Sequence, residues 1–571
     1  MKVNKKKIAN KELLTRVFLA SLIVLPLPME NIMAADLSPM AREEQNQRLL
    51  QESREREARQ EQKDVFMQEK EKSKESIALP QEDISFYIQQ IQLEGEKTEK
   101  FSWLQAEIEK YQERKIGMQG IQMLVKQLEN SLIDRGYITT RIVIPEQDLA
   151  TGSLRIALLE GKINQIRMEE ESDKLHWQNA FPAQAGDILN LRHLEQGLEQ
   201  LKRIQSREVD MQIVPAEQLG MSDIVLTAKA KNPISFTTSI GDYGSEATGK
   251  RQIYNTLKID NLLNANDILT LSFNDDGEHQ DDEKGTHGEG FSYSIPNGNW
   301  TYTLSRNNYQ YHQTLWSHIN KFIFSGTSEE YRFYAEKLLT RNQTSKTYLQ
   351  IGINRKSSHS YVQDTEILLQ RKQTTVLNLG LYRRQYINQD LLDLNVSYKC
   401  GVPWLNAQED FAEKNSQLPT THYNLWNFDA TYIKPIKVGR NALQYRFTLS
   451  GQYTKDYLYA VDCMSIGNRY TVRGFDGEET LIGEKGFYIQ NELSIPIEAN
   501  HQLFLGLDYG YVTGPSTMGY SSKSLLGGVV GLRGELWKNM QYEIFVGWPL
   551  KKPDELITAK QAYGFQATYR F

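Results

Sequence analysis

The sequence predicts an all-β transmembrane barrel that follows a polar helix and two small α/β modules. From residue 233 to 571, runs of roughly ten residues alternate between apolar and polar side chains and are separated by polar turns. In the run from Leu443 to Tyr453, for example, apolar and aromatic residues alternate with Gln, Arg, Thr and Ser. Lipid on one face of each strand and water on the other explains this pattern. A mean hydropathy of -0.56 excludes a bundle of membrane-spanning helices, whereas strands that are apolar on one face are compatible with it.

The sequence of residues 1–35 is typical of a secretory signal. A lysine-rich start precedes the apolar run from Val17 to Leu27, and the small residues Ala34 and Ala35 mark the expected cleavage site. The apolar run is too short to anchor the chain across a membrane. We therefore expect the protein to be exported from the cytoplasm.

The segment 36–63 is expected to form a helix that is polar on all sides. Ser38 is a candidate N-cap, and glutamates precede arginines by four residues, as in Glu44 and Arg48. Because it offers few apolar residues to a core, this helix is either solvated, disordered or lodged in a watery lumen, and a charged linker is the plainer alternative. About 25 residues reach about 37 Å, which is enough to cross an outer membrane through a pore. Residues 64–80 are expected to form a flexible tether.

Two similar α/β modules are predicted between this helix and the barrel, over residues 81–161 and 162–232. Each contains a helix of clear apolar periodicity, from Ile121 to Leu132 in the first module and from Leu191 to Ile204 in the second. Small sheets of this kind expose a strand edge beside a helix, where an extended peptide can add by main-chain hydrogen bonds; the alternative is that both modules are spacers. The residues that we predict to recognise such a peptide are Leu191, Leu194, Leu198 and Arg203.

The loop around Arg473 gives the clearest functional signal. In the segment YTVRGFDGE, from Tyr470 to Glu478, Gly474 permits a tight turn and Phe475 requires an apolar environment. An arginine between such residues is poorly suited to an exposed loop. We therefore expect the tip of the loop to fold inward.

A later strand offers this arginine a partner. From Leu503 to Val512 the residues alternate strictly, which places Asp508 on one face between Gly506 and Gly510. The two glycines leave space around the carboxylate, and a guanidinium that entered this space would form short, directional, charge-assisted hydrogen bonds. The sequence thus predicts a contact between Arg473 and Asp508, with an ordinary surface ion pair as the alternative.

The motif Val472-Arg473-Gly474-Phe475, together with Asp508, resembles the outer-membrane transporters of two-partner secretion. In this family, also called TpsB or the haemolysin activation/secretion family, a VRGF/Y loop folded into the barrel meets an aspartate on the inner wall. The family includes transporters of the filamentous-haemagglutinin and contact-dependent-inhibition types. The segments RGYITTRIVIPEQDLATGSL and GDILNLRHLEQGLEQLKR resemble the signatures of its two POTRA domains. The resemblance extends over nearly all of the mature chain.

The resemblance implies a barrel of sixteen antiparallel strands, a plug helix for residues 36–63, two periplasmic POTRA domains and an inward loop over about 457–486. Sixteen strands over residues 233–571 leave about 21 residues for each strand and its turn, which suits membrane strands of 9 to 11 residues. The last residues alternate in one phase up to Tyr569 and Phe571. This ending resembles the signature that the barrel-assembly machinery reads in outer-membrane proteins.

No catalytic, metal-binding or cofactor-binding pattern is found in the sequence. GxSxG, HExxH and phosphate-binding glycine motifs are absent, and the nine histidines are scattered. A net charge of -6 gives no indication of a nucleic-acid partner. Cys400 and Cys463 could pair in an oxidising compartment, although Cys400 is in phase with lipid-facing residues, so the disulfide stays an open possibility.

The function that the resemblance implies is secretion of a large unfolded exoprotein across the bacterial outer membrane. A monomer embedded in lipid and lipopolysaccharide would bind the N-terminal secretion domain of this partner, which could be a haemolysin, an adhesin or a contact-dependent toxin. A barrel-insertion factor is one alternative, but it usually has more POTRA domains and no polar plug helix. A nutrient receptor is another, but it needs a globular plug, for which residues 36–80 lack apolar side chains.

Overall fold

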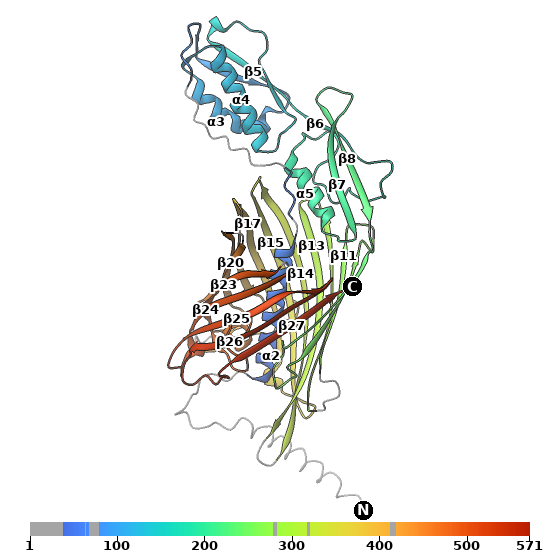
Figure 1. The fold of residues 1–571 in the computed structure, drawn as a ribbon, viewed down its shortest axis with the longest axis vertical. Helices are drawn as coiled ribbons and strands as arrows, with labels where there is room; N and C mark the ends of the chain where they lie inside the picture. Colours follow the sequence, from blue (N-terminus) through green and yellow to red (C-terminus); the bar gives the residue numbers. More distant parts are fainter. Residues whose placement is uncertain are drawn as a thin grey trace, which may run out of the picture.

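The structure is a computed structural model of the 571-residue chain. It describes residues 38–62, 64–67, 79–277, 283–316, 320–410, 418–439, 441–498 and 500–571. Sixteen long antiparallel strands close into a barrel, and two small α/β modules stand end to end beyond one rim (Figure 1). The predicted secretory signal, residues 1–35, lies outside the described residues.

The barrel strands follow one another around the wall in chain order. They are β9 (Ile234–Gly241), β10 (Gln252–Asp260), β11 (Ile268–Asp276), β12 (Lys284–Asn297), β13 (Trp300–Trp316), β14 (Lys321–Arg341), β15 (Ser345–Val362), β17 (Lys372–Ile387), β18 (Asp390–Gly401), β19 (Asn424–Val438), β20 (Asn441–Thr454), β23 (Lys485–Glu498), β24 (His501–Thr513), β25 (Ser524–Trp537), β26 (Met540–Lys551) and β27 (Ala562–Arg570). The short strand β16 (Thr365–Glu366) extends the hairpin at the end of β15. Pairing of β27 with β9, from Gln566–Gly241 to Arg570–Thr237, closes the barrel.

The two faces of each strand meet different environments, as the alternation in the sequence predicts. In β24, Leu505 and Leu507 are 39% and 51% exposed on the outer face, whereas Asp508 is 0% exposed on the inner face. Apolar residues thus point toward lipid, and the polar residues between them point into the lumen.

Each module folds around its own apolar core. The first contains β1 (Phe86–Ile88), β2 (Gln90–Glu94), α3 (Gln105–Ile108), β3 (Arg114–Ile116), α4 (Met118–Asp134), β4 (Arg141–Val143) and β5 (Ser153–Leu159). The second contains β6 (Lys162–Met168), α5 (Leu191–Lys202), β7 (Arg207–Pro215) and β8 (Met221–Ala230). The sheet orders are β2-β5-β4 and β6-β8-β7, so each module leaves strand edges unpaired within its own sheet.

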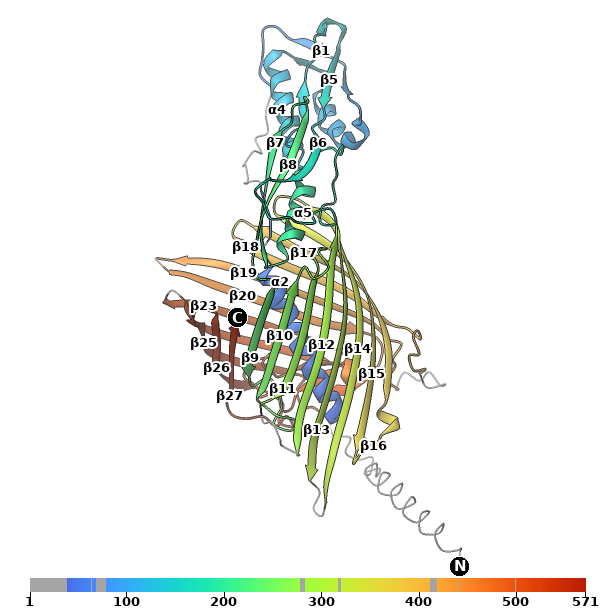
Figure 2. The same ribbon diagram turned by 90° about the vertical axis from the view of Figure 1, so that its right-hand side faces the viewer.

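The polar N-terminal helix α2 (Pro39–Glu61) runs lengthwise inside the barrel, with its C-terminal end toward the modules (Figure 2). Ser38 caps it by accepting a hydrogen bond from the backbone N–H of Ala41. Among the described residues, no helix has the length and apolar character needed to cross a membrane.

Residues 64–80, predicted to be a flexible tether, are described only in part. The segment Asp64–Met67 contacts both the second module and the barrel through hydrogen bonds and ion pairs. The prediction of a free tether is therefore wrong for these four residues, because side chains distant in sequence satisfy their polar groups.

Candidate functional site

The loop between β20 and β23 folds inward and forms a hairpin through the short strands β21 (Met464–Ile466) and β22 (Leu481–Gly483). At its tip, Arg473 donates to Asp508 on β24, from Nε to Oδ2 at 2.7 Å and from Nη2 to Oδ1 at 3.0 Å. The backbone N–H of Arg473 also donates to Asp508 Oδ2, at 3.0 Å. This bidentate contact, with a third bond from the main chain, fixes both the side chain and the backbone of the tip.

A second carboxylate, which the sequence analysis did not identify, completes this site. Glu492 on β23 accepts a hydrogen bond from Arg473 Nη1 and another from Arg533 on β25. Glu492 is 6% exposed, so its charge is shielded from bulk water and depends on these two guanidinium groups. The alternation of β23 places Glu492 on the inner face. This alternation is visible in the sequence and could have been used to predict that Glu492 faces the lumen.

The wall beneath the tip is lined with glycine because the backbone of the loop lies against it. A Cβ atom at Gly506 would lie 2.7 Å from Arg473 Nη2, and one at Gly510 would lie 2.7 Å from Val472 Cγ2. At Gly527 on β25 a Cβ would lie only 1.8 Å from the carbonyl oxygen of Arg473. Because the contact at Gly527 is with backbone, no side chain fits there while the loop is seated, whereas a side chain at Gly506 or Gly510 would push aside side chains of the seated loop.

The tip itself is anchored by apolar packing and by hydrogen bonds that Asp476 accepts. Val472 and Phe475 are 0% and 2% exposed and pack with residues of β22, β24 and β25. Gly474 has a φ of 107°, which permits the turn between them. Asp476 accepts hydrogen bonds from Thr558 Oγ1 at 3.1 Å and from the backbone N–H of Ala559 at 2.7 Å, which ties the loop to the connection between β26 and β27.

Helix α2 also contacts the inward loop. Arg48 donates to the carbonyl oxygens of Val461 and Cys463 at 2.8 and 2.7 Å, and Gln45 donates to that of Ala460 at 2.5 Å. These carbonyls belong to the segment that leads from β20 into β21. The helix and the loop therefore support each other.

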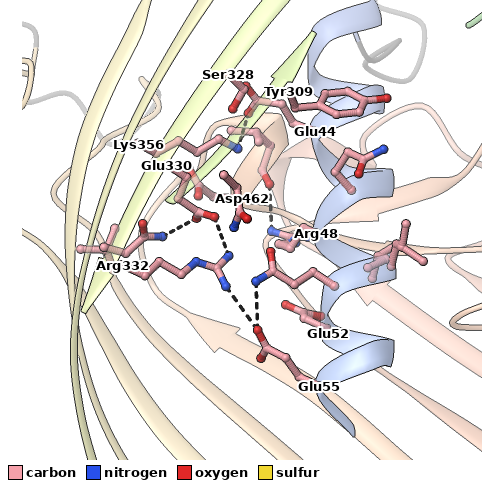
Figure 3. A pocket seen from close by; sticks show the side chains of 18 of the residues that line it. Glu44, Arg48, Glu52, Glu55, Tyr309, Ser328, Glu330, Arg332, Lys356 and Asp462 are labelled. Carbon is pink, nitrogen blue, oxygen red and sulfur yellow. Dashed lines mark hydrogen bonds and ion pairs between the residues drawn. The ribbon is translucent and has the colours of Figure 1, made fainter. Parts of the chain in front are cut away.

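Many other contacts of α2 are with polar side chains of the barrel wall, and Met40 at its N-terminal end packs against Tyr311 and Phe324. Glu44 pairs with Lys356 at 2.8 Å and Glu55 with Arg332 at 3.3 Å (Figure 3). Arg56 donates to the hydroxyl of Tyr488 at 2.7 Å. Beside the helix the lumen retains a polar cavity of about 700 Å³. The helix is thus held largely by polar contacts, next to water-accessible space.

Sequence comparison identifies the family to which this architecture belongs. The profile of the haemolysin secretion/activation proteins ShlB/FhaC/HecB matches residues 220–534. POTRA profiles match residues 86–161, as the ShlB type, and residues 162–215. The chain belongs to this family. It is an outer-membrane transporter of the two-partner secretion class, with its POTRA domains in the periplasm.

Individual relatives agree with this assignment. The outer membrane transporter CdiB-2 of Burkholderia pseudomallei is 40% identical over 461 residues, which cover 80% of this chain and 79% of that protein. The hemolysin transporter protein ShlB of Serratia marcescens is 27% identical over 387 residues, 67% of each chain. The solved structure of CdiB from Acinetobacter baumannii superposes with a TM-score of 0.82 at 28% identity, over 94% of this chain and 100% of that one.

The two cysteines of this family member are free. Cys400 lies in β18 in the outward phase of Leu394 and Val396, whereas Cys463 is 0% exposed and lies in the inward loop. Because the barrel wall separates the two thiols, the disulfide considered from the sequence is wrong.

The recognition residues predicted on α5 are not available to a peptide. Leu191, Leu194 and Leu198 are 4%, 0% and 3% exposed and face the interior of the second POTRA domain. Arg203 follows the helix, and its Nη2 donates to Ser294 Oγ on the barrel at 2.5 Å. The prediction is therefore wrong for these four side chains, because the three leucines pack within the domain and Arg203 contacts the barrel rim.

The C-terminal aromatic residues lie at the closing seam of the barrel. Tyr569 is in β27, and Phe571 is 68% exposed beside Phe236, whose carbonyl oxygen accepts a hydrogen bond from the Phe571 backbone N–H at 2.8 Å. An exposed aromatic ring on the outer face is compatible with an interfacial position in lipid.

Proposed function

We propose that this transporter recognises one large exoprotein in the periplasm and passes it, unfolded, through the barrel to the cell surface. The main support for this proposal is the polar helix α2 in the lumen. A helix that is held in a barrel by polar contacts can leave it without exposing an apolar core. In this mechanism the POTRA domains capture the N-terminal secretion domain of the exoprotein and α2 leaves the lumen. The exoprotein then passes the seated loop and folds outside, which favours outward movement.

The class of exoprotein is part of the same proposal. The cargo is a haemolysin, an adhesin or a contact-dependent toxin, and the relatives named as hemolysin transporters support the first of these. We infer no catalytic activity, cofactor or nucleic-acid partner. We also propose that the protein acts as a monomer in a bilayer with lipopolysaccharide, and that Tyr569 and Phe571 present its C-terminal signature to the barrel-assembly machinery.

Removal of α2 tests the plug. A chain that lacks residues 39–61 should show a higher single-channel conductance in planar bilayers, because the helix lies lengthwise in the lumen and fills part of it (Figure 2). The matched control is Glu61→Gln, which breaks only the exposed pair with Arg570 and should leave conductance unchanged. Equal conductance of the deletion variant and the unaltered chain would contradict the plug.

A further inference from the structure

The segment Asp64–Met67, between α2 and the first POTRA domain, lies in a site built by α5 and the periplasmic rim of the barrel (Figure 1). Its main chain is bound on one side by two glutamates of α5. The backbone N–H of Val65 donates to Glu199 Oε2 at 3.2 Å, and that of Met67 donates to Glu195 Oε1 at 2.8 Å. Glu195 and Glu199 are 0% and 5% exposed, so both are built into the junction.

The spacing of these glutamates matches an extended polypeptide. Alternate N–H groups of an extended chain point to the same side about 6.6 Å apart, and residues four apart on a helix are separated by about 6 Å along its axis. Two carboxylates at i and i+4 therefore fit the repeat of any extended chain. The side chain of Met67 is 40% exposed, whereas Val65 is 9% exposed in the core of the second POTRA domain and Phe66 packs against Tyr386. The resident segment therefore adds side-chain contacts of its own to the two main-chain bonds.

The barrel supplies the opposite wall of the site with cations. Arg341 donates to the carbonyl oxygen of Val65 and pairs with Glu199 at 3.0 Å. Asp64 lies between Lys346 and Arg384, its Oδ2 3.3 Å from an Arg384 nitrogen. The barrel cations therefore neutralise the glutamates and hold an acidic residue at the first position of the segment.

We propose that this junction is a binding site for the main chain of the transported polypeptide at the mouth of the pore, occupied at rest by the transporter's own segment Asp64–Met67. The proposal rests on the secretion function. A transporter of one long unfolded chain needs contacts that do not depend on sequence, and alternate backbone N–H groups are present in every non-proline stretch. Entry of the exoprotein would displace the segment and release the C-terminal end of α2.

Binding of a peptide in trans tests the site. The full chain is made with Asp64→Asn and Phe66→Ala in its own segment. These changes weaken the ion pairs of Asp64 with Lys346 and Arg384 and remove the packing of Phe66 against Tyr386, so they loosen the hold on the resident segment and leave the sequence of α5 and the barrel unchanged. A fluorescein-labelled peptide copying residues 60–69 should bind this variant at least about tenfold more tightly than the unaltered chain, measured by fluorescence anisotropy. Equal binding to the two chains, or no binding to either, would overturn the proposal.

Two changes at one peptide position distinguish main-chain from side-chain recognition. N-methylation at the position of Met67 removes the donor to Glu195 and should weaken binding at least about tenfold. Replacement of the same residue, Met67→Gln, keeps the donor and should leave affinity within about threefold. A peptide that binds equally well with the N-methyl group, or fails with glutamine, refutes main-chain recognition.

Secretion by living cells provides the second test. Glu199→Gln alters the site and should reduce secretion of the exoprotein at least about tenfold, whereas Asp64→Asn alters only the resident segment and should keep at least the unaltered level. Heat-modifiable migration on gels checks barrel folding of both variants. Equal loss of secretion in two folded variants would show that the junction is only a structural clasp. If the unaltered chain secretes no exoprotein, the secretion function itself is wrong.

Discussion

Replacement of Arg473 by alanine should abolish most secretion without preventing barrel insertion. Among the residues that the structure describes, Arg473 is the one cation that pairs with Asp508, which is 0% exposed. Arg473→Ala leaves this carboxylate buried with no hydrogen bond from a guanidinium, and Glu492 loses one of its two cations. Breaking a buried pair in this way costs about 3–5 kcal/mol, a factor of about 10² to 4 × 10³ in favour of an unseated loop.

The structure predicts a smaller effect for the partner residue. After Asp508→Ala, Arg473 still pairs with Glu492, so the unpaired charge that makes Arg473→Ala costly does not arise. We expect Asp508→Ala to cost about 2–3 kcal/mol, the value of charged hydrogen bonds, and to retain more secretion than Arg473→Ala. The double variant should be hardly worse than Arg473→Ala alone.

Quantification of exoprotein in the culture medium measures these effects, with heat-modifiable migration as the check on folding. Limited proteolysis of intact cells should cut the loop in both variants and spare it in the unaltered chain. Two results would refute the reasoning that the two residues and Glu492 act as one cluster. One is a loss of secretion in the double variant equal to the product of the two single losses, and the other is a larger loss for Asp508→Ala than for Arg473→Ala.

Three further predictions concern the loop wall, the helix and the periplasmic domains. Gly527→Ala should displace the loop, because its Cβ would overlap the carbonyl oxygen of Arg473, and secretion should fall at least about tenfold. The control is Gly528→Ala on the same strand, whose Cβ would come no closer than 3.4 Å to the side chain of Leu550; equal effects of the two changes would contradict the close approach. Arg48→Ala removes two bonds to the loop and should raise the frequency of channel openings about tenfold, which single-channel recording would detect. The purified fragment 81–230 should bind the N-terminal secretion domain of the exoprotein by calorimetry at tens of micromolar or tighter, and no binding would move recognition to the barrel.

A residue of this site could be predicted from the sequence only where a pattern within one short segment marks it. Arg473 and Asp508 could be paired from the sequence because the motif is a short contiguous pattern and the strand around Asp508 alternates without a break. Glu492 and Gly527 could not, since a single glutamate or glycine in a barrel strand has no local feature that distinguishes it. Register between neighbouring strands brings them to the tip, and register is set by pairings across the barrel.

The barrel alternation was predictable for the same reason, because it repeats every two residues and requires no knowledge of neighbours. Helix α5 shows the opposite case. Its leucines recur with a clear helical period. Such a period indicates that one face of the helix is buried, but it does not identify the part of the protein that covers this face. In the sequence, the polar face of α5, which contains Glu195 and Glu199, has the composition of a solvated surface. In the structure this face is buried, because the barrel rim and the segment Asp64–Met67 cover it.

The width of α2 has a consequence for the permeability of the cell envelope. A helix with its side chains is about 10–12 Å across, whereas an extended chain occupies about 5 Å by 10 Å, roughly half that cross-section. A single polypeptide that replaces α2 therefore does not refill the lumen, and the cavity of about 700 Å³ beside the helix adds to the unfilled space. Ions and small solutes should leak past the exoprotein while it moves, so a secreting cell should take up small hydrophilic solutes faster than a resting one.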